Sequence, residues 1–588
     1  MTSTAFTRAA LLEEGGYRCE AVVFSPLEER RTDIERLTSA GVLPAAGRLA
    51  NLWDLLSELP DPAPKSVPKW DHRLKDDAHT EEFEVDGVVR VRTHFATGER
   101  RILQREHFRP DGTLLVVDRQ DTRTRGVPGG RRVTLFDRRE RPVRAWRSIW
   151  PLYDHVLDEY LGGDPAVIFY DSKVTAPYGQ RYRRPNVASV HVIHNLHLAP
   201  GEVPPLGVLN PARAPMMREL FTFDRVVCST DRQRSDIAEL LGADPEIRVI
   251  PPAIGPAPAA EGGSEGASGR DQSLGAVLAS LDERKRVVQV VEAVARARTL
   301  APEADIRLEI FGSGSSERAI AKRIEALGLE GSVHLRGHQP GAKGVFRRAG
   351  WTALTSTHEG FGMAIAEAMS AGCVPFAYDV PYGPAELLAA FPEHLVADGD
   401  IEALARSIAD FASADPEQAQ QQSSAAVRAA EEFQPAAVGA EWRRLVNGLE
   451  PEIGAGAGAP AKEPRVEAFR VARTDSAVDL QIDIGWPHAK ELPDVSLGVA
   501  NGNLEWRRDA AIRRLAGNRV RARVRLKRGE FPEALAGDRD VIAVFGRGTG
   551  ARRVVVSERT ALGGVGTSTV GVRGTARIAR AIRRRLAA

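Results

Sequence analysis

The stretch LTSTHEGFGMAIAEAMSAGCVPFAYDVPYGPAELL, residues 354–388, decides the fold. Its apolar start predicts a strand that ends at Ser356–Thr357, and its alanine-rich middle predicts a helix over Met363–Ala371. Between them, Glu359-Gly360-Phe361-Gly362 forms a turn at the helix N-terminus. Two glycines there leave backbone N–H groups uncovered, which suits an anionic phosphate or the hydroxyls of a sugar.

Two carboxylates frame this turn. Glu359 stands before the predicted helix and Glu367 lies two turns into it, so both can face one crevice and accept hydrogen bonds from vicinal hydroxyls. Taken alone, the pair also has a purely structural interpretation, in which Glu359 caps the helix and Glu367 is a solvated helix residue. The flanking segments TS, EGFG and EAM-x-AGC favour a binding site.

Bulk composition bounds the class of protein. A chain of 588 residues is long enough for about two to four domains. Lys and Arg number 80 against 79 Asp and Glu, so no basic surplus indicates a nucleic-acid partner. Cys19, Cys228 and Cys373 form no Cys-x-x-Cys pair, which argues against a disulfide framework and a thiolate zinc site. The sequence shows neither a signal peptide nor a long apolar run, so we expect a cytoplasmic protein.

Periodicity divides the chain into successive zones. Strands alternating with helices predict parallel α/β domains, period-two alternation predicts antiparallel strands, and Pro/Gly/Ser/Ala-rich stretches predict linkers. The expected organisation is an N-terminal Rossmann-like domain at 1–80 and 148–255, an inserted β-sheet at 81–147, a linker at 256–272, a second Rossmann-like domain at 273–449, a linker at 450–464, a β-sandwich-like domain at 465–560 and a basic tail at 561–588.

The basic tail has helical periodicity. Ile578, Ile582 and Leu586 repeat at i, i+4 and i+8 among arginines that meet no acidic residue. A solvated tail and contact with the inner membrane surface or an anionic polymer are both open interpretations.

Several segments resemble glycosyltransferase family 4. The Glu-x7-Glu pattern of Glu359 and Glu367 and the stretch IFGSGSSERAIAKRIEALGLEGSVHLRGHQPG at 310–341 are similar to the family's second domain. ASVHVIHNLHL, FDRVVCSTDRQRSDI and DVPYGPAEL resemble the branch that glycosylates poly(glycerol-phosphate) and wall teichoic acids. The resemblance covers most of residues 150–450.

The resemblance implies a GT-B fold, with two Rossmann-like domains, and a retaining transfer that needs no metal. The implied donor is UDP-glucose or UDP-N-acetylglucosamine, and the implied acceptor is an anionic polymer such as a polyol-phosphate chain, or a lipid-linked glycan. In that branch an inserted sheet mediates assembly, which implies a homo-oligomer.

The resemblance also assigns roles to individual residues. Glu359 is expected to contact hydroxyls of the donor sugar and Glu367 those of the ribose. Lys285 is expected to neutralise the diphosphate as it leaves, and His194 to stabilise the cationic transition state beside the anomeric centre. The donor-binding set is completed by the glycine turn at Gly312 and the backbone of Gly360, Phe361, Gly362 and Met363.

Three histidines need separate interpretations. His194 follows a strand at the edge where a parallel sheet presents residues to a cleft, and His197 is the alternate candidate. The spacing His191-x2-His194-x2-His197 suggests a metal site, but residues three apart on a strand face opposite sides. One zinc ion is therefore not expected to bind all three, and a buried structural histidine is the remaining interpretation.

Two departures from the family pattern bear on activity. Ser280 stands five residues before Lys285, where the family has a diphosphate-binding arginine, so either Arg284 or Arg286 substitutes or donor binding is weakened. The chain also begins at Met1 after the point where the family's first strand and Gly-Gly loop are expected. Two hypotheses follow, an active transferase and a degenerate one that binds glycan or assists assembly.

Overall fold

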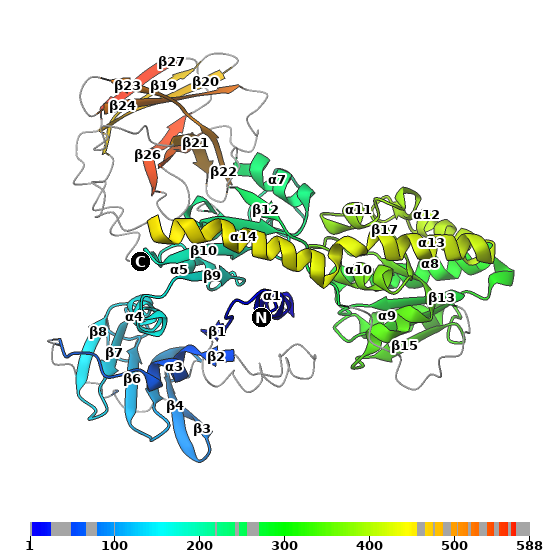
Figure 1. Ribbon diagram of the computed structural model, residues 1–588, viewed down its shortest axis with the longest axis horizontal. Coiled ribbons are helices and arrows are strands. Elements are labelled where there is room, and N and C mark those ends of the chain that lie inside the picture. The colour runs from blue at the N-terminus through cyan, green and yellow to red at the C-terminus, as the bar shows by residue number, and fades with distance from the viewer. Residues whose placement is uncertain are drawn as a thin grey trace. The chain divides into compact units, whose positions relative to one another are not determined.

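The computed structural model describes most of the chain. The described residues are 3–24, 49–65, 67, 74, 79–98, 100–217, 220–241, 246–255, 270–455, 465–473, 477–485, 495–501, 504–515, 519–527, 538–545, 552–561 and 566–571. The chain divides into two compact units, Met1–Ala166 and Val167–Ala588 (Figure 1). Most of the predicted linker at 256–272 and the basic segment after Gly571 lie outside the described residues.

The first unit contains an antiparallel sheet whose six strands follow one another in sequence order. The turn between the first two strands is Asp86-Gly87, where both residues have positive φ, 52° and 77°, as a tight hairpin turn requires. The strands are β3 (Thr80–Val85), β4 (Val88–Phe95), β5 (Ile102–Phe108), β6 (Leu114–Arg119), β7 (Arg132–Phe136) and β8 (Pro142–Trp146).

Helices α3 (Leu52–Glu58) and α4 (Trp150–Leu161) share one core with this sheet. Leu52, Val116 and Leu152 are buried within it. The remaining elements of the unit are α1 (Ser3–Glu13) and a separate parallel pair, β1 (Ala21–Val23) and β2 (Leu49–Asn51).

The division of the chain differs from the expected domain at 1–80 and 148–255. Among the described residues, β1 and β2 pair with each other and with no other strand. Helix α4 packs into the core of the antiparallel sheet. The first unit therefore ends at Ala166, beyond α4.

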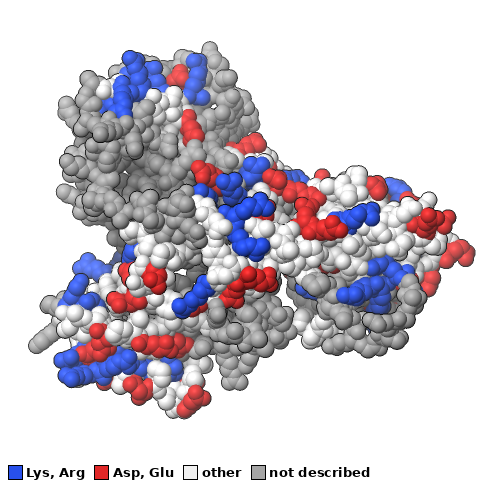
Figure 2. All heavy atoms as spheres, in the orientation of Figure 1, with Lys and Arg blue, Asp and Glu red and all other residues white. Residues whose placement is uncertain are grey.

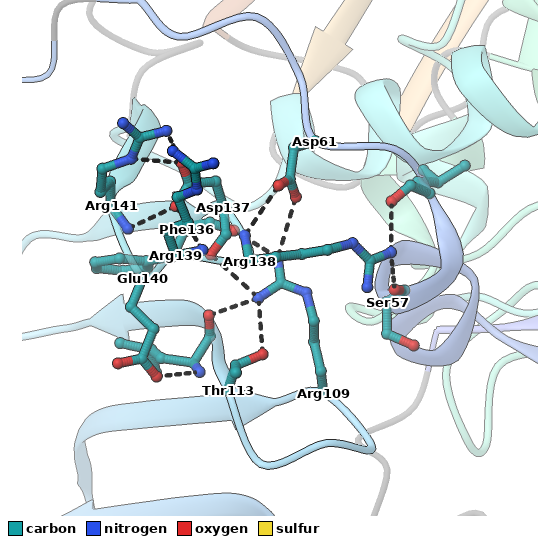
Figure 3. Close-up of polar contacts among 12 residues, drawn as sticks. Ser57, Asp61, Arg109, Thr113, Phe136, Asp137, Arg138, Arg139, Glu140 and Arg141 are labelled. Carbon is teal, nitrogen blue, oxygen red and sulfur yellow. Dashed lines mark hydrogen bonds and ion pairs between the residues drawn. The ribbon is translucent and has the colours of Figure 1, made fainter.

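Arg109 joins two turns of the antiparallel sheet (Figure 3). Its buried guanidinium donates hydrogen bonds to the carbonyl oxygens of Leu114, at 2.8 Å, and Phe136, at 2.6 Å. The Asp61 carboxylate lies 3.6 Å from the same guanidinium. Burial lowers the pKa of Arg109. Because one cation binds carbonyls at the start of β6 and the end of β7, the β5–β6 and β7–β8 turns are held together.

The second unit begins with a four-stranded sheet in the order β12-β11-β10-β9. The pairs β10–β11 and β11–β12 are parallel, as the sequence predicts. Its elements are β9 (Ala166–Tyr170), α5 (Ala176–Gly179), β10 (Val187–Val192), α6 (Ala214–Met217), η1 (Leu220–Thr222), β11 (Arg225–Cys228), α7 (Asp231–Leu241) and β12 (Ile247–Val249).

A six-stranded parallel sheet follows in the order β15-β14-β13-β16-β17-β18, which is the strand order of a Rossmann fold. Its elements are β13 (Asp271–Leu278), η2 (Glu283–Lys285), α8 (Val287–Leu300), η3 (Pro302–Ala304), β14 (Arg307–Phe311), α9 (Glu317–Ala326), β15 (Val333–Gly337), η4 (Ala342–Arg347), β16 (Ala349–Leu354), α10 (Met363–Ser370), β17 (Val374–Tyr378), α11 (Gly383–Leu387), η5 (Pro392–His394) and β18 (Leu395–Val396).

Helices α12 (Ile401–Ala412), α13 (Pro416–Ala429), η6 (Glu431–Phe433) and α14 (Pro435–Ala455) complete the α/β region. The last of these returns to the first parallel sheet, where Trp442 packs edge-on against Phe169 of β9, with ring centroids 5.7 Å apart. The linker predicted from Glu450 is wrong in its first part, since α14 continues to Ala455. Pro451 lacks an N–H donor, but its neighbours are compatible with a helix.

The C-terminal strands form a five-stranded and a four-stranded antiparallel sheet. The strands are β19 (Arg465–Arg473), β20 (Ala477–Gly485), β21 (Val495–Asn501), β22 (Leu504–Asp509), β23 (Ala511–Leu515), β24 (Arg519–Lys527), β25 (Asp538–Phe545), β26 (Arg552–Ala561) and β27 (Gly566–Gly571). The predicted boundary at residue 560 is too early, because β27 pairs with β19. How the two sheets pack against each other stays a prediction.

Charges of both signs are interspersed on the face of the described residues in Figure 2. None of the described helices combines the length and apolar character needed to cross a bilayer.

Candidate active site

Strand order predicts a ligand-binding crevice at the carboxyl ends of β13 and β16, the two central strands of the six-stranded sheet. β13 and β16 are neighbours at the point where the order reverses, and ligands bind outside the carboxyl ends of the strands at such a point. Lys285 follows β13 and Glu359 follows β16. Lys285 Nζ donates to Glu359 Oε1 at 2.5 Å, and both side chains are largely buried. The structure thus brings together two residues that the sequence predicted for one site.

Glu359 is fixed by its neighbours on both backbone and side chain. Ser356 Oγ donates to Glu359 Oε1 at 2.5 Å. The Glu359 backbone N–H donates to Pro381 O at 2.6 Å, and the Tyr382 N–H donates to Glu359 O at 2.8 Å. Among the described residues no donor binds Oε2. That oxygen is available to accept a hydrogen bond from a ligand hydroxyl, and Ser356 is a contact that sequence reasoning missed.

The glycine turn is shaped by close approach of other backbone. A Cβ placed on Gly360 would lie 2.0 Å from His194 O, and Gly362 has a φ of +102° at the N-cap of α10. Phe361 turns its ring into the core, edge-on to Phe433 at 5.2 Å. Met363 packs against the same core, so backbone rather than these two side chains is left for a ligand.

Glu367 forms a second lysine–carboxylate pair. Lys343 Nζ on η4 donates to Glu367 Oε1 at 2.6 Å. The Glu367 side chain is only 13% exposed, so it is not the solvated helix residue of the alternative interpretation. Burial raises the pKa of Glu367, and Lys343 opposes that shift. Contact of Glu367 with ribose stays a prediction.

His194 lies beside a carboxylate that the sequence analysis did not single out. Its Nε2 is 2.8 Å from Asp171 Oδ1, and both side chains are largely buried. Asp171 directly follows β9 and His194 lies two residues after β10, so neighbouring strands end together and bring the pair into contact. An aspartate directly after an apolar strand was the available signal.

The other two histidines make unrelated contacts. His191 is buried, with Nδ1 2.7 Å from Tyr170 O and its ring stacked on Phe223. His197 is buried against Tyr382, whose hydroxyl lies 3.4 Å from His197 Nδ1. Burial lowers the pKa of His191 to about 4 and that of His197 to about 3. The described residues contain no group of three His, Cys, Asp or Glu side chains arranged to hold a metal ion.

Position 280 carries no cation. Ser280 Oγ donates to Asp282 Oδ2 at 2.8 Å. Of the two suggested substitutes, Arg286 donates to Thr355 O at 2.6 Å and Ser356 O at 2.7 Å and also pairs with Asp398, so it braces the loop before Ser356. Arg284 lies 3.6 Å from Asp282 and remains partly exposed.

Gly312 directly follows β14 and lies close to the chain that leaves β13. It has a φ of +137°, and a Cβ there would lie 1.8 Å from Ala279 O, so only glycine lets β14 end this close to the chain leaving β13.

The two parallel sheets are also joined beside the crevice. Glu386 on α11 accepts hydrogen bonds from the backbone N–H groups of Asp231, at 3.1 Å, and Arg232, at 2.8 Å, at the start of α7. Arg232 also pairs with Asp379 at 3.1 Å. The Glu386 carboxylate, from the region of the six-stranded sheet, therefore caps helix α7 of the region that contains the four-stranded sheet.

Comparison with known proteins agrees with this geometry. Residues 267–428 match the family model described as glycosyl transferases group 1. A poly(glycerol-phosphate) alpha-glucosyltransferase of Bacillus subtilis is 36% identical over 112 residues, 19% of this chain and 16% of that protein. An exopolysaccharide phosphotransferase of Streptomyces coelicolor is 32% identical over 200 residues, 33% of this chain and 20% of that protein. The chain therefore spans a fifth or less of the length of these two relatives.

Among solved structures, a mutant form of Staphylococcus aureus TarM in complex with fondaparinux, alpha-GlcNAc-glycerol and UDP has a TM-score of 0.55 at 17% identity. The alignment covers 76% of this chain and 96% of that one. The predicted GT-B fold is confirmed by this likeness and by the two parallel sheets. The chain thus has a GT-B fold, and its residues 267–428 match the family model of the group 1 glycosyl transferases.

Proposed function

We propose that the chain is a retaining, metal-independent glycosyltransferase that moves a hexose or N-acetylhexosamine from a UDP-sugar to a polyol-phosphate chain or related cell-surface polymer. The observation that carries the proposal is the Lys285–Glu359 pair at the switch point of a group 1 glycosyl transferase domain. The named activity of the Bacillus subtilis relative and the UDP and alpha-GlcNAc-glycerol of the TarM complex support this donor and acceptor class.

The proposed chemistry uses the side chains at the crevice. Glu359 accepts hydrogen bonds from hydroxyls of the donor sugar through its open carboxylate oxygen, and the backbone of Gly360 to Met363 binds the sugar and diphosphate. Lys285 neutralises the charge that develops on UDP as the glycosidic bond breaks. His194, held by Asp171, stabilises the oxocarbenium-like transition state. The departing diphosphate oxygen takes the acceptor's proton, so the new bond forms on the face that UDP leaves.

The proposal extends to the setting of the reaction. The protein acts in the cytoplasm at the inner membrane surface, where a lipid-linked or anionic polymer acceptor is available. The six-stranded sheet β3–β8 mediates homo-oligomer formation, and the basic segment after Gly571 contacts anionic lipid. Equilibrium sedimentation of the protein and of a form truncated after Gly571, with and without anionic vesicles, tests both statements.

Release of UDP by the purified protein tests the activity. UDP-glucose and UDP-N-acetylglucosamine are each supplied with poly(glycerol-phosphate), and wild-type protein is compared with Glu359→Gln, His194→Ala and Glu367→Ala. We expect the first two variants to lose at least about 100-fold in turnover and the third mainly to raise the KM for the donor. Glu325→Gln on the exposed face of α9 serves as the control.

A degenerate, glycan-binding protein is the competing function. The absence of a cation at Ser280 favours it, because the hydroxyl is committed to Asp282. If the wild-type protein neither releases UDP nor binds it in calorimetry, the proposed transferase activity is refuted. If the wild-type protein turns over and Glu359→Gln does not, the degenerate alternative is excluded.

A further inference from the structure

Arg213 is a cation held at the edge of the crevice by the first parallel sheet. It lies in the turn before α6, where its backbone N–H donates to Asn210 O at 2.8 Å. Its Nη1 donates to Asn195 O at 3.3 Å. Gln233, fully buried on α7, donates to the same carbonyl at 3.0 Å, which fixes the position of Asn195.

The segment that Arg213 contacts is the one that faces the glycine turn. Asn195 directly follows His194, whose carbonyl oxygen would be 2.0 Å from a Cβ on Gly360. The same Cβ would be 3.4 Å from the Asn195 Cα. Arg213 and the Gly360 turn therefore both contact the short segment His194–Asn195. Arg213 belongs to the region of the first parallel sheet, and Gly360 to that of the six-stranded sheet.

The charge of Arg213 is not neutralised by a carboxylate of the described residues. No ion pair joins it to any of them, and burial is the sole cause that lowers its pKa. A guanidinium has five N–H donors, and a single side-chain hydrogen bond accounts for one of them. A partly buried cation without a counter-charge is costly unless an anion completes its environment.

Two other partly buried arginines show how this fold otherwise satisfies such a group. Arg270 donates to the carbonyl oxygens of Phe346, Ala349 and Ala371. Arg286 donates to two carbonyls and pairs with a carboxylate. Arg270 and Arg286 both have structural roles, because protein carbonyls and a carboxylate supply their hydrogen-bond partners. Arg213 lacks that set of partners among the described residues, so it differs from the structural arginines of the same unit.

The positive charge of Arg213 affects His358, in the loop before Glu359, as well as His197, which follows the first parallel sheet. Burial lowers the pKa of His358, the residue before Glu359, and the positive charges of Arg284, Lys285 and Arg213 lower it further, while Glu359 opposes them. Burial and Arg213 also lower the pKa of His197. Three cations thus lower the pKa of His358, and Glu359 is the carboxylate that raises it.

We propose that Arg213 binds phosphoryl oxygens of the reactants and supplies, from the opposite side of the crevice, the cationic fork that Ser280 cannot provide. The donor diphosphate is the favoured source of those oxygens, because Lys285 and Arg284 approach the same place from the nucleotide-binding sheet. A phosphate of the acceptor polymer is the second source of the same chemistry. This inference rests on the proposed function, since it specifies the ligand of that site.

Binding of UDP in the absence of acceptor tests the inference directly. Calorimetry compares wild-type protein with Arg213→Gln and Arg213→Lys, using UDP and uridine as probes. We expect Arg213→Gln to raise the Kd for UDP about 10- to 100-fold, with Arg213→Lys intermediate and uridine binding unchanged. Arg248→Gln, an exposed arginine on β12 of the same sheet, is the matched control. Thermal unfolding of each variant monitors folding, and the lysine variant keeps the test valid if the glutamine variant is unstable.

The remaining outcomes separate the two sources and the two proposals. Unchanged UDP binding together with a raised KM for poly(glycerol-phosphate), but not for a neutral polyol acceptor, assigns Arg213 to the acceptor phosphate. Unchanged UDP binding and unchanged acceptor KM overturn the inference and leave the proposed function intact. Wild-type protein that binds no UDP contradicts the proposed function and this inference with it.

Discussion

Lys285 and Glu359 form a 2.5 Å ion pair across the switch point of the six-stranded parallel sheet. Ser356 donates to the carboxylate oxygen that Lys285 binds, so the position of the pair is fixed by a third group. The pair presents a preorganised cation and an open carboxylate oxygen to the crevice, which reduces the reorganisation needed when a charged donor enters.

Removal of the Lys285 charge should weaken nucleotide binding. Lys285→Met keeps most of the length of the side chain without the charge, and we expect the Kd for UDP to rise about 10- to 100-fold, the value of a charge-assisted hydrogen bond. Calorimetry provides the measurement. Lys322→Met, exposed on α9, should bind UDP like the wild type. Equal UDP affinity in Lys285→Met and wild type would remove Lys285 from the site.

Asp171 should act through His194. We expect Asp171→Asn to lower kcat by at least about tenfold with little change in the donor KM, because the partner 2.8 Å from the imidazole loses its negative charge. A double-mutant cycle with His194→Ala checks this assignment. If Asp171→Asn lowers kcat as much in the His194→Ala background as in wild type, the two residues act independently.

Glu386 should stabilise the start of α7. Its carboxylate accepts hydrogen bonds from the backbone N–H groups of Asp231 and Arg232, and loss of such a cap costs about 1 kcal/mol, so Glu386→Ala should speed hydrogen exchange in the first turn of α7 about fivefold. Hydrogen exchange detected by mass spectrometry measures this change. Glu325→Ala is the control, and equal exchange in Glu386→Ala and wild type would contradict the prediction.

The buried histidines should make the fold sensitive to acid. Their pKa values in the folded chain are lowered, to about 4 for His191 and about 3 for His197, below the ordinary value of about 6.5 in the unfolded chain. Between these values the unfolded state binds more protons, so stability falls as the pH decreases.

The free energy of unfolding should fall by about 2 kcal/mol per buried histidine between about pH 6.5 and about pH 5. Urea unfolding at several pH values measures it. His191→Asn keeps an amide donor for Tyr170 O without a titrating group, and it should reduce the slope of stability against pH by about half the histidine contribution. A slope equal to that of the wild type would contradict neutral burial of His191.

Arg109 should stabilise the turns of the antiparallel sheet. Arg109→Met leaves the carbonyls of Leu114 and Phe136 without their donor, which should cost about 3 kcal/mol. Hydrogen exchange detected by mass spectrometry should then show roughly 100-fold faster exchange in β6 and β7. Arg100→Met, whose side chain is 88% exposed, provides the control. Unchanged exchange in Arg109→Met would show that the guanidinium is dispensable.

The parallel sheets could be predicted from the sequence because apolar strands alternate with helices at regular spacing. The turn at Glu359–Gly362 followed from its glycines, and the structure brings Lys285 to the predicted Glu359. Asp171, Ser356 and Lys343 were not predicted, since each reaches the site through tertiary contacts that leave no periodic signal.

Element ends were predicted less well than element types. A Pro/Gly-rich stretch predicted a linker from Glu450, but α14 continues to Ala455 because one proline removes only one hydrogen bond. The strand β27 was missed because Gly566–Gly571 is short, glycine-bounded and polar, and its pairing with β19 spans about a hundred residues of chain.

The two glycines of the EGFG turn are required for different reasons. Gly362 needs its own positive φ of +102°, whereas Gly360 has no positive φ and is required because His194 O, from the other parallel sheet, would be 2.0 Å from its Cβ. A methyl group at position 360 is therefore compatible with the turn itself but not with the approach of the two sheets. Gly360→Ala should therefore push the glycine turn away from His194 and hold the two parallel sheets further apart.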